Sequence, residues 1–70
     1  MGRHPCPCCG APTLSRQPPG THEICVVCLW EDDAGQFENP DTAAGANGMS
    51  LNEARANFRR HGRCYSPEPS

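Results

Sequence analysis

Large hydrophobic side chains are scarce in this sequence of 70 residues. Leu, Ile, Val and Phe together occupy 8 positions, well under the roughly 20% below which chains tend to stay disordered. A chain this short buries only about 60% of its unfolded surface even with an ordinary core. The scarcity excludes a fold held by hydrophobic burial alone, so the chain needs disulfides, a metal or a partner.

Lysine is absent, and the remaining charge is unevenly distributed. The sequence has six arginines and eight acidic residues, which gives a formal net charge of −2. Seven of the acids and no base lie in residues 17–54, whereas four arginines fall in residues 55–63. Because nucleic-acid-binding domains are normally basic overall, this composition argues against a nucleic-acid partner. It favours a protein partner with a basic surface.

A long apolar run is also missing. The longest, residues 24–30, has seven residues, against the roughly 20 that a membrane-spanning helix needs. Residues 1–10 are rich in Pro and Cys and lack the apolar stretch of a secretion signal. We therefore expect a cytoplasmic protein without membrane contact, whose paired cysteines bind metal in a reducing compartment.

Six cysteines supply the missing stabilisation. Cys6 and Cys9 form one CxxC pair, Cys25 and Cys28 form another, and 15 residues separate the pairs. This spacing predicts one structural zinc ion held by four thiolates, with no position left open for catalysis. Iron and a disulfide framework are the alternatives. A zinc deaminase is disfavoured, because no H-x-E motif precedes the cysteines.

Two cysteines and two histidines lie outside this set. Cys8 is inside the first pair, and Cys64 follows close behind His61 near the C-terminus, while His22 precedes the second pair. Each of the two thiols is a small apolar residue, a reactive thiol or a ligand of a second metal site. A second site would require Cys8, Cys64 and either His61 or His22 to converge from separate segments.

One helix is clearly marked, at residues 50–61. Ser50 and Glu53 fit a capping box, and Gly62 stands where a left-handed C-terminal cap belongs. The apolar stripe of this helix consists of Leu51, Ala54, Phe58 and His61. We expect the stripe to pack on Trp30, with Phe37 and Phe58 as the aromatic partners of that residue.

The rest of the chain is expected to be mostly turn and loop. Residues 13–14 and 22–25 should pair as an antiparallel hairpin across a turn at residues 17–20. Residues 31–48 should form an ordered loop, and residues 66–70 a frayed tail. The candidate partner surface on this loop comprises Glu31, Asp32, Asp33 and Asp41. The first three either form a solvated turn or pair with Arg55 or Arg59.

These residues together resemble the bacterial cysteine-rich CPCC family. The resemblance covers roughly residues 6–64, in the expected order. The matching segments are CPCCG at 6–10, EICVVCLWEDD at 23–33, GAN at 45–47 and SLNEARANF at 50–58. Val26 is a departure, because relatives often have proline there. The resemblance implies a small stand-alone bacterial protein and supplies no settled activity.

We therefore predict a single domain over residues 1–65, a small metal-stapled α+β fold. It should be zinc-ribbon-like, with rubredoxin-like knuckles, a short β-hairpin and one C-terminal helix. The expected function is a non-catalytic structural-zinc module that binds a protein such as a basic toxin or a nucleic-acid enzyme. One alternative is a nucleic-acid-binding ribbon that uses the arginine-rich helix, with Tyr65 for stacking. The other is a metal-handling or catalytic protein with a second metal site.

Overall fold

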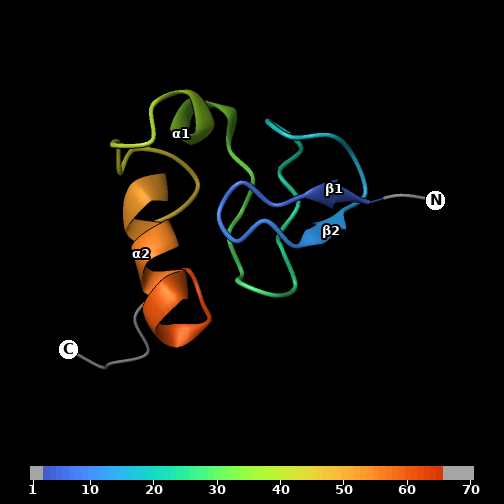
Figure 1. Ribbon diagram of the computed structural model, residues 1–70. Coiled ribbons are helices and arrows are strands. Elements are labelled where there is room, and N and C mark those ends of the chain that lie inside the picture. The colour runs from blue at the N-terminus through green and yellow to red at the C-terminus, as the bar shows by residue number, and fades with distance from the viewer. Residues whose placement is uncertain (1–2, 66–70) are drawn as a thin grey trace.

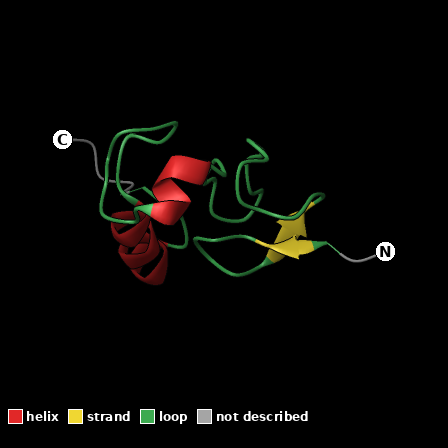
Figure 2. Ribbon diagram, turned by 90° about the horizontal axis from the view of Figure 1, so that it is seen from above, coloured by secondary structure: helices red, strands yellow, loops and turns green. Residues whose placement is uncertain are grey.

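The computed structural model describes residues 3–65. Its elements in chain order are β1 (His4–Pro5), β2 (Pro12–Leu14), α1 (Ala34–Glu38) and α2 (Leu51–His61). The strands and the two helices lie on opposite sides of the molecule, with the cysteine-bearing loops between them (Figures 1 and 2). Neither helix in residues 3–65 is long and apolar enough to span a membrane. The tail expected at residues 66–70 lies outside the described residues.

The strands form a two-stranded antiparallel sheet, with His4 opposite Leu14 and an irregular register beside that pair. The prediction that residues 13–14 pair with residues 22–25 is therefore wrong. The first CxxC turn reverses the chain, so β2 pairs with β1 instead. The segment that was expected to pair with β2 instead folds back on itself, with an isolated bridge between Ile24 and Glu31. Both reversals occur at a cysteine pair, so the two turns control the course of the chain.

Helix α2 has the ends that its sequence predicts. The Ser50 hydroxyl accepts a hydrogen bond from the Glu53 amide at 3.0 Å. At the other end, Gly62 adopts φ 77° and donates its amide to the Phe58 carbonyl. A left-handed conformation favours glycine, which has no Cβ to clash. The helix therefore ends at the predicted residue and begins one residue after the predicted start, with Ser50 as its cap.

The core consists of cysteines and a few large side chains. Trp30 is 1% exposed and lies in one buried cluster with Leu51, Ala54 and several cysteines. Phe58 packs against this cluster while staying partly buried, which confirms the predicted docking of α2 near Trp30. His61 is exposed. The apolar stripe of α2 therefore ends at Phe58 rather than at His61, since the last turn of the helix faces solvent.

The segment at residues 31–48 contains a short helix that was not expected. The Asp33 side chain caps α1 by accepting the Gln36 amide at 3.0 Å. Gln36 is fully buried, whereas Phe37 is 41% exposed. The expectation that Phe37 would pack on Trp30 is therefore wrong, because α1 directs its glutamine inward and its aromatic residue toward solvent. The fold otherwise agrees with the expected small α+β arrangement, since it has a two-stranded hairpin, the helix α2 and a cluster of four cysteines that could hold a metal ion.

Candidate metal centre

The two CxxC pairs sit on turns with the same backbone hydrogen bonds. We call residues 6–11 the first knuckle and residues 25–30 the second knuckle. In each, the amide of the fifth residue donates to the carbonyl of the first cysteine, and the amide of that cysteine donates to the sixth carbonyl. The bonds are Gly10 to Cys6 (2.8 Å), Cys6 to Ala11 (2.9 Å), Leu29 to Cys25 (2.8 Å) and Cys25 to Trp30 (2.9 Å). The two turns are equivalent despite their different sequences.

The fifth residue of each knuckle adopts the left-handed conformation. Gly10 has φ 81° and Leu29 has φ 74°. Glycine enters this region freely, whereas a residue with a Cβ is destabilised there by about 1–2 kcal/mol. Leu29 is also 38% exposed, so its burial offsets only part of that strain. The second knuckle thus keeps a strained, half-exposed leucine where its counterpart has glycine.

The knuckles face each other so that four sulfurs converge. The Sγ atoms of Cys6 and Cys28 are 3.6 Å apart, and those of Cys9 and Cys25 are 3.7 Å apart. All four Sγ atoms lie within 4.8 Å of one another. A disulfide bond is about 2.05 Å long, so these cysteines are free thiols. In a tetrahedral centre with metal–sulfur bonds of about 2.3 Å, sulfurs lie about 3.8 Å apart. The four residues therefore fit a tetrahedral metal ion.

Backbone amides and one hydroxyl point at the sulfurs. The amide of Cys8 donates to the Cys6 sulfur at 3.4 Å. The amides of Val27 and Cys28 donate to the Cys25 sulfur at 3.4 Å and 3.5 Å. The Thr13 hydroxyl, on β2, donates to the Cys25 sulfur at 3.0 Å. Hydrogen bonds to sulfur favour the thiolate, which is the form that binds metal. Such bonds also orient a ligand for its metal.

The four thiols ionise unequally. Burial raises the pKa of Cys25, but hydrogen bonds from Thr13 and from two knuckle amides outweigh it and bring the pKa to about 6. The hydrogen bond with Cys28 raises the pKa of Cys6, and burial adds to this. Burial raises the pKa of Cys9 to about 11. Since neighbouring thiolates repel each other, a divalent cation is the natural compensation for four of them.

The part of the chain that carries these cysteines matches a known protein family. The family model described as cysteine-rich CPCC matches residues 4–68. The chain belongs to the cysteine-rich CPCC family. The match spans the hairpin, both knuckles and the two helices, and we call these matched residues the CPCC domain. No curated protein matches the chain.

Cys8, Cys64, His22 and His61 do not form a second metal-binding group in residues 3–65. Within residues 3–65, the four knuckle sulfurs form the one group of three or more ligating side chains close enough to hold an ion. Cys8 and Cys64 are buried members of the core cluster, and burial raises the pKa of Cys64. His61 is exposed, and His22 lies 3.7 Å from the carboxylate of a glutamate. The two cysteines therefore lie in the buried core, outside the group of four sulfurs.

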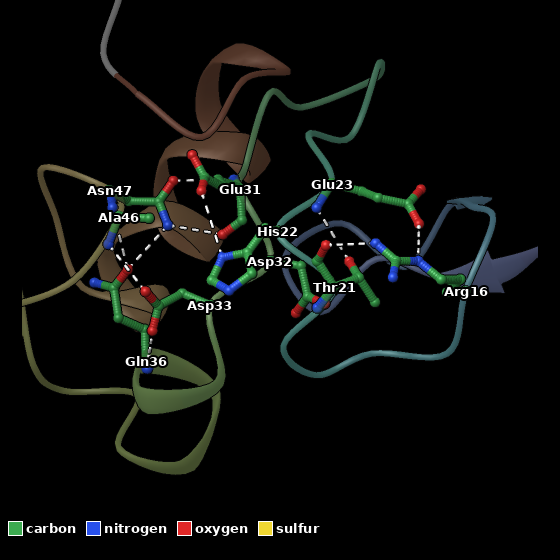
Figure 3. A network of polar contacts seen from close by, with 10 residues as sticks. All are labelled: Arg16, Thr21, His22, Glu23, Glu31, Asp32, Asp33, Gln36, Ala46 and Asn47. Carbon is green, nitrogen blue, oxygen red and sulfur yellow. Dashed lines mark hydrogen bonds and ion pairs between the residues drawn. The ribbon is translucent and has the colours of Figure 1, made fainter.

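The predicted acidic surface is largely engaged inside the CPCC domain, as Figure 3 shows. Asp32 is 1% exposed and accepts the Thr21 amide at 2.8 Å, while its Oδ1 has no partner among the described residues. The prediction that Asp32 belongs to a partner surface is therefore wrong, because its side chain is buried. Asp33 accepts the amides of Gln36 and Ala46, each at 3.0 Å. These hydrogen bonds hold the pKa of Asp33 below its usual range.

The expected pairing of these acids with arginines of α2 does not occur. Within residues 3–65 the ion pair is that of Arg16 with Glu23 (3.3 Å), and the His22 ring lies 3.7 Å from the Glu31 carboxylate. Arg55 instead donates to the Pro7 carbonyl at 2.9 Å and so joins α2 to the first knuckle, while Arg59 is exposed. Of the four predicted acids, Asp41 is the exposed one, and it accepts the Asn52 side chain at 2.7 Å.

Gln36 has a role in the fold that was not predicted from the sequence. Its Nε2 donates to the carbonyls of Thr42 (3.0 Å) and Met49 (2.8 Å). Its Oε1 accepts from the side chain (2.9 Å) and the amide (3.3 Å) of Asn47. A Cβ on Gly45 would lie 2.8 Å from the Gln36 side chain. One buried amide thus fixes the loop that leads from α1 to α2. No local pattern marks a glutamine for this role.

Proposed function

We propose that the CPCC domain is a non-catalytic module in which one structural zinc ion stabilises a surface that binds another protein. The proposed ligands are Cys6, Cys9, Cys25 and Cys28. The observation that carries the proposal is the convergence of four sulfurs at separations suited to a tetrahedral ion. Four protein ligands leave no position for a substrate, and this arrangement is typical of structural rather than catalytic zinc.

The scarcity of large core residues supports a structural role for the metal. The largest apolar side chains that are fully buried are Trp30, Leu14 and Leu51. Structural zinc contributes about 10–16 kcal/mol to the folding of small zinc-binding peptides. The net stability of an ordinary folded domain is only about 5–15 kcal/mol. We therefore expect the bound ion to decide whether this chain folds.

Elemental analysis and chelation test the metal part of the proposal. The purified protein should contain one zinc ion per chain, and a chelator should abolish its far-ultraviolet circular dichroism together with the native Trp30 fluorescence. Cys28→Ser should lose zinc. Cys64→Ser is the matched control, because Cys64 is also buried but lies outside the sulfur cluster. A metal-free protein with native spectra would refute the proposal.

Nucleic-acid binding is the second candidate, and the exposed arginines at the end of α2 are the observation that favours it. Arg59 and Arg60 are exposed, and Tyr65 is 41% exposed nearby in the chain. The formal net charge is −2, and four thiolates with one Zn²⁺ make it more negative. We therefore expect no micromolar binding of DNA or RNA in fluorescence anisotropy at about 150 mM salt. Tight binding that Arg59→Ala weakens would favour this candidate instead.

A further inference from the structure

The two knuckles are equivalent in backbone but unequally covered. In the first knuckle, Cys8 is 9% exposed, and α2 contacts the turn through the hydrogen bond from Arg55 to Pro7. In the second knuckle, the position equivalent to Pro7 is Val26, which is 80% exposed. The position equivalent to Cys8 is Val27, which is 38% exposed. The more apolar of the two turns is thus the one that the chain leaves open.

Apolar residues adjoin the second knuckle on both flanking segments. We define the second-knuckle surface as Ile24, Val26, Val27, Leu29 and Tyr65, whose exposed fractions run from 38% to 80%. Tyr65 belongs to it because the amide of the preceding Cys64 donates to the Cys28 carbonyl at 2.7 Å. These residues account for five of the six exposed large hydrophobic residues in the described chain. Their concentration at one turn suggests an interface.

Leu29 gives an independent reason to expect an interface here. Its left-handed backbone is the conformation that Gly10 adopts at the equivalent position, and glycine would relieve the strain. The leucine side chain is nevertheless 38% exposed, so it is not retained to fill the core. Strained residues that packing does not require often lie at functional sites.

Beside the valines the exposed charge is positive, whereas the two acids that flank the second knuckle, Glu23 and Glu31, contact Arg16 and His22. Arg63 donates to the Val27 carbonyl at 3.4 Å and is itself exposed. Arg59 and Arg60 lie in the last turn of α2, which leads into this segment, and both are exposed. A partner that covers the valines would therefore gain from acidic residues placed next to its apolar ones.

We infer that the second knuckle is the docking surface for an amphipathic helix of a partner protein, apolar toward Val26, Val27 and Leu29 and acidic toward Arg63. The inference rests on the proposed function and adds the place and the chemistry of the contact. A helix suits the surface because α2 already covers the equivalent turn of the first knuckle. Helices that dock in this way present side chains at i, i+3, i+4 and i+7.

The test uses the zinc-loaded protein and two synthetic helical peptides of about four turns each. Both peptides carry leucines on one face, flanked by glutamates in the first and by lysines in the second. Nuclear magnetic resonance should show the glutamate peptide shifting the amides of Val26, Val27, Leu29 and Arg63. The glutamate peptide should bind at least about tenfold more tightly than the lysine peptide.

Variants locate the contact. Val26→Ser combined with Val27→Ser should weaken the glutamate peptide by about tenfold or more. Phe37→Ser is the matched control, because Phe37 is 41% exposed but lies on α1, and it should leave the affinity unchanged. Arg63→Glu should abolish the preference for the glutamate peptide. Arg3→Glu should keep it, since Arg3 is an exposed arginine that bonds instead to Thr13 on β2.

Several outcomes would overturn the inference. These are equal affinity for both peptides, no binding by zinc-loaded protein, and binding that the double serine variant leaves intact. Self-association in sedimentation experiments that the double serine variant abolishes would make a second copy the occupant instead. Zinc content separates this inference from the proposed function. A folded protein without zinc refutes the proposed function, whereas a zinc-loaded protein that ignores the peptides refutes the docking surface alone.

Discussion

Replacing Gln36 with leucine tests whether one buried amide fixes the loop between α1 and α2. The substitution keeps a side chain of similar volume in the same buried space, so it creates little cavity. It removes the two bonds to the carbonyls of Thr42 and Met49 and the two bonds from Asn47. Those partners lose their contacts while the apolar leucine occupies the space where water would otherwise replace them.

The magnitude follows from these four bonds. A neutral hydrogen bond contributes about 0.5–1.5 kcal/mol net, and a buried polar group left without a partner costs about 1–3 kcal/mol. Local opening of the loop would let water bond to the groups left without a partner and so recover part of this free energy, because residues 43–46 are already exposed. We therefore expect Gln36→Leu to lower the free energy of unfolding by about 3–5 kcal/mol, a large share of the stability of a small domain.

Urea unfolding followed by Trp30 fluorescence measures this change, since the chain has a single tryptophan. The free zinc concentration must be held constant, because binding of the proposed ion would add to the apparent stability. Gln17→Leu is the matched control, as Gln17 is exposed. A loss below about 1 kcal/mol for Gln36→Leu, or a loss equal to that of the control, would refute the reasoning.

Three further predictions concern single residues. Leu29→Gly should leave stability within about 1 kcal/mol or raise it, because relief of left-handed strain offsets the backbone entropy of glycine; a larger loss in urea contradicts the strain. Phe58→Ala should cost about 1.5–2.5 kcal/mol, roughly half the value for a fully buried phenylalanine, since Phe58 is only partly buried; unchanged Trp30 emission would contradict the packing. Hydrogen bonds from the Ser15 amide and hydroxyl lower the pKa of Glu23 from 4.5 to about 2. The stability from these bonds is present above pH 4.5 and is lost as the pH falls toward 2, so carbon NMR should find Glu23 ionised at pH 4.5; half protonation there would contradict it.

The features that could be predicted from the sequence are those with local signals. Helix α2 begins at its serine cap and ends before its glycine because both residues act within one turn of the helix. The convergence of the four knuckle sulfurs was predicted from spacing, because a CxxC turn presents two sulfurs whatever surrounds it. The burial of Trp30 was also predicted from the sequence, because few other side chains are large enough to fill the core.

The features that could not be predicted depend on contacts between distant segments. Residues 13–14 were correctly expected to be extended, but strand propensity does not say which segment pairs with them, and β1 was the partner. Asp32 has the composition of a surface residue, yet the fold-back of residues 22–32 encloses it. The role of Gln36 depends on two carbonyls that its own segment does not contain. Polar residues buried by tertiary contacts carry no periodic signal.

The order of the elements along the chain has a consequence for biosynthesis. Both knuckles precede α1 and α2, so a ribosome delivers all four thiols before it makes the segment that covers the first knuckle. Chains fold from the N-terminal side during synthesis, at about 5–20 residues per second. The ligand set is therefore complete seconds before α2 emerges. We expect co-translational metal capture to come first and the helix to close over a centre that is already assembled.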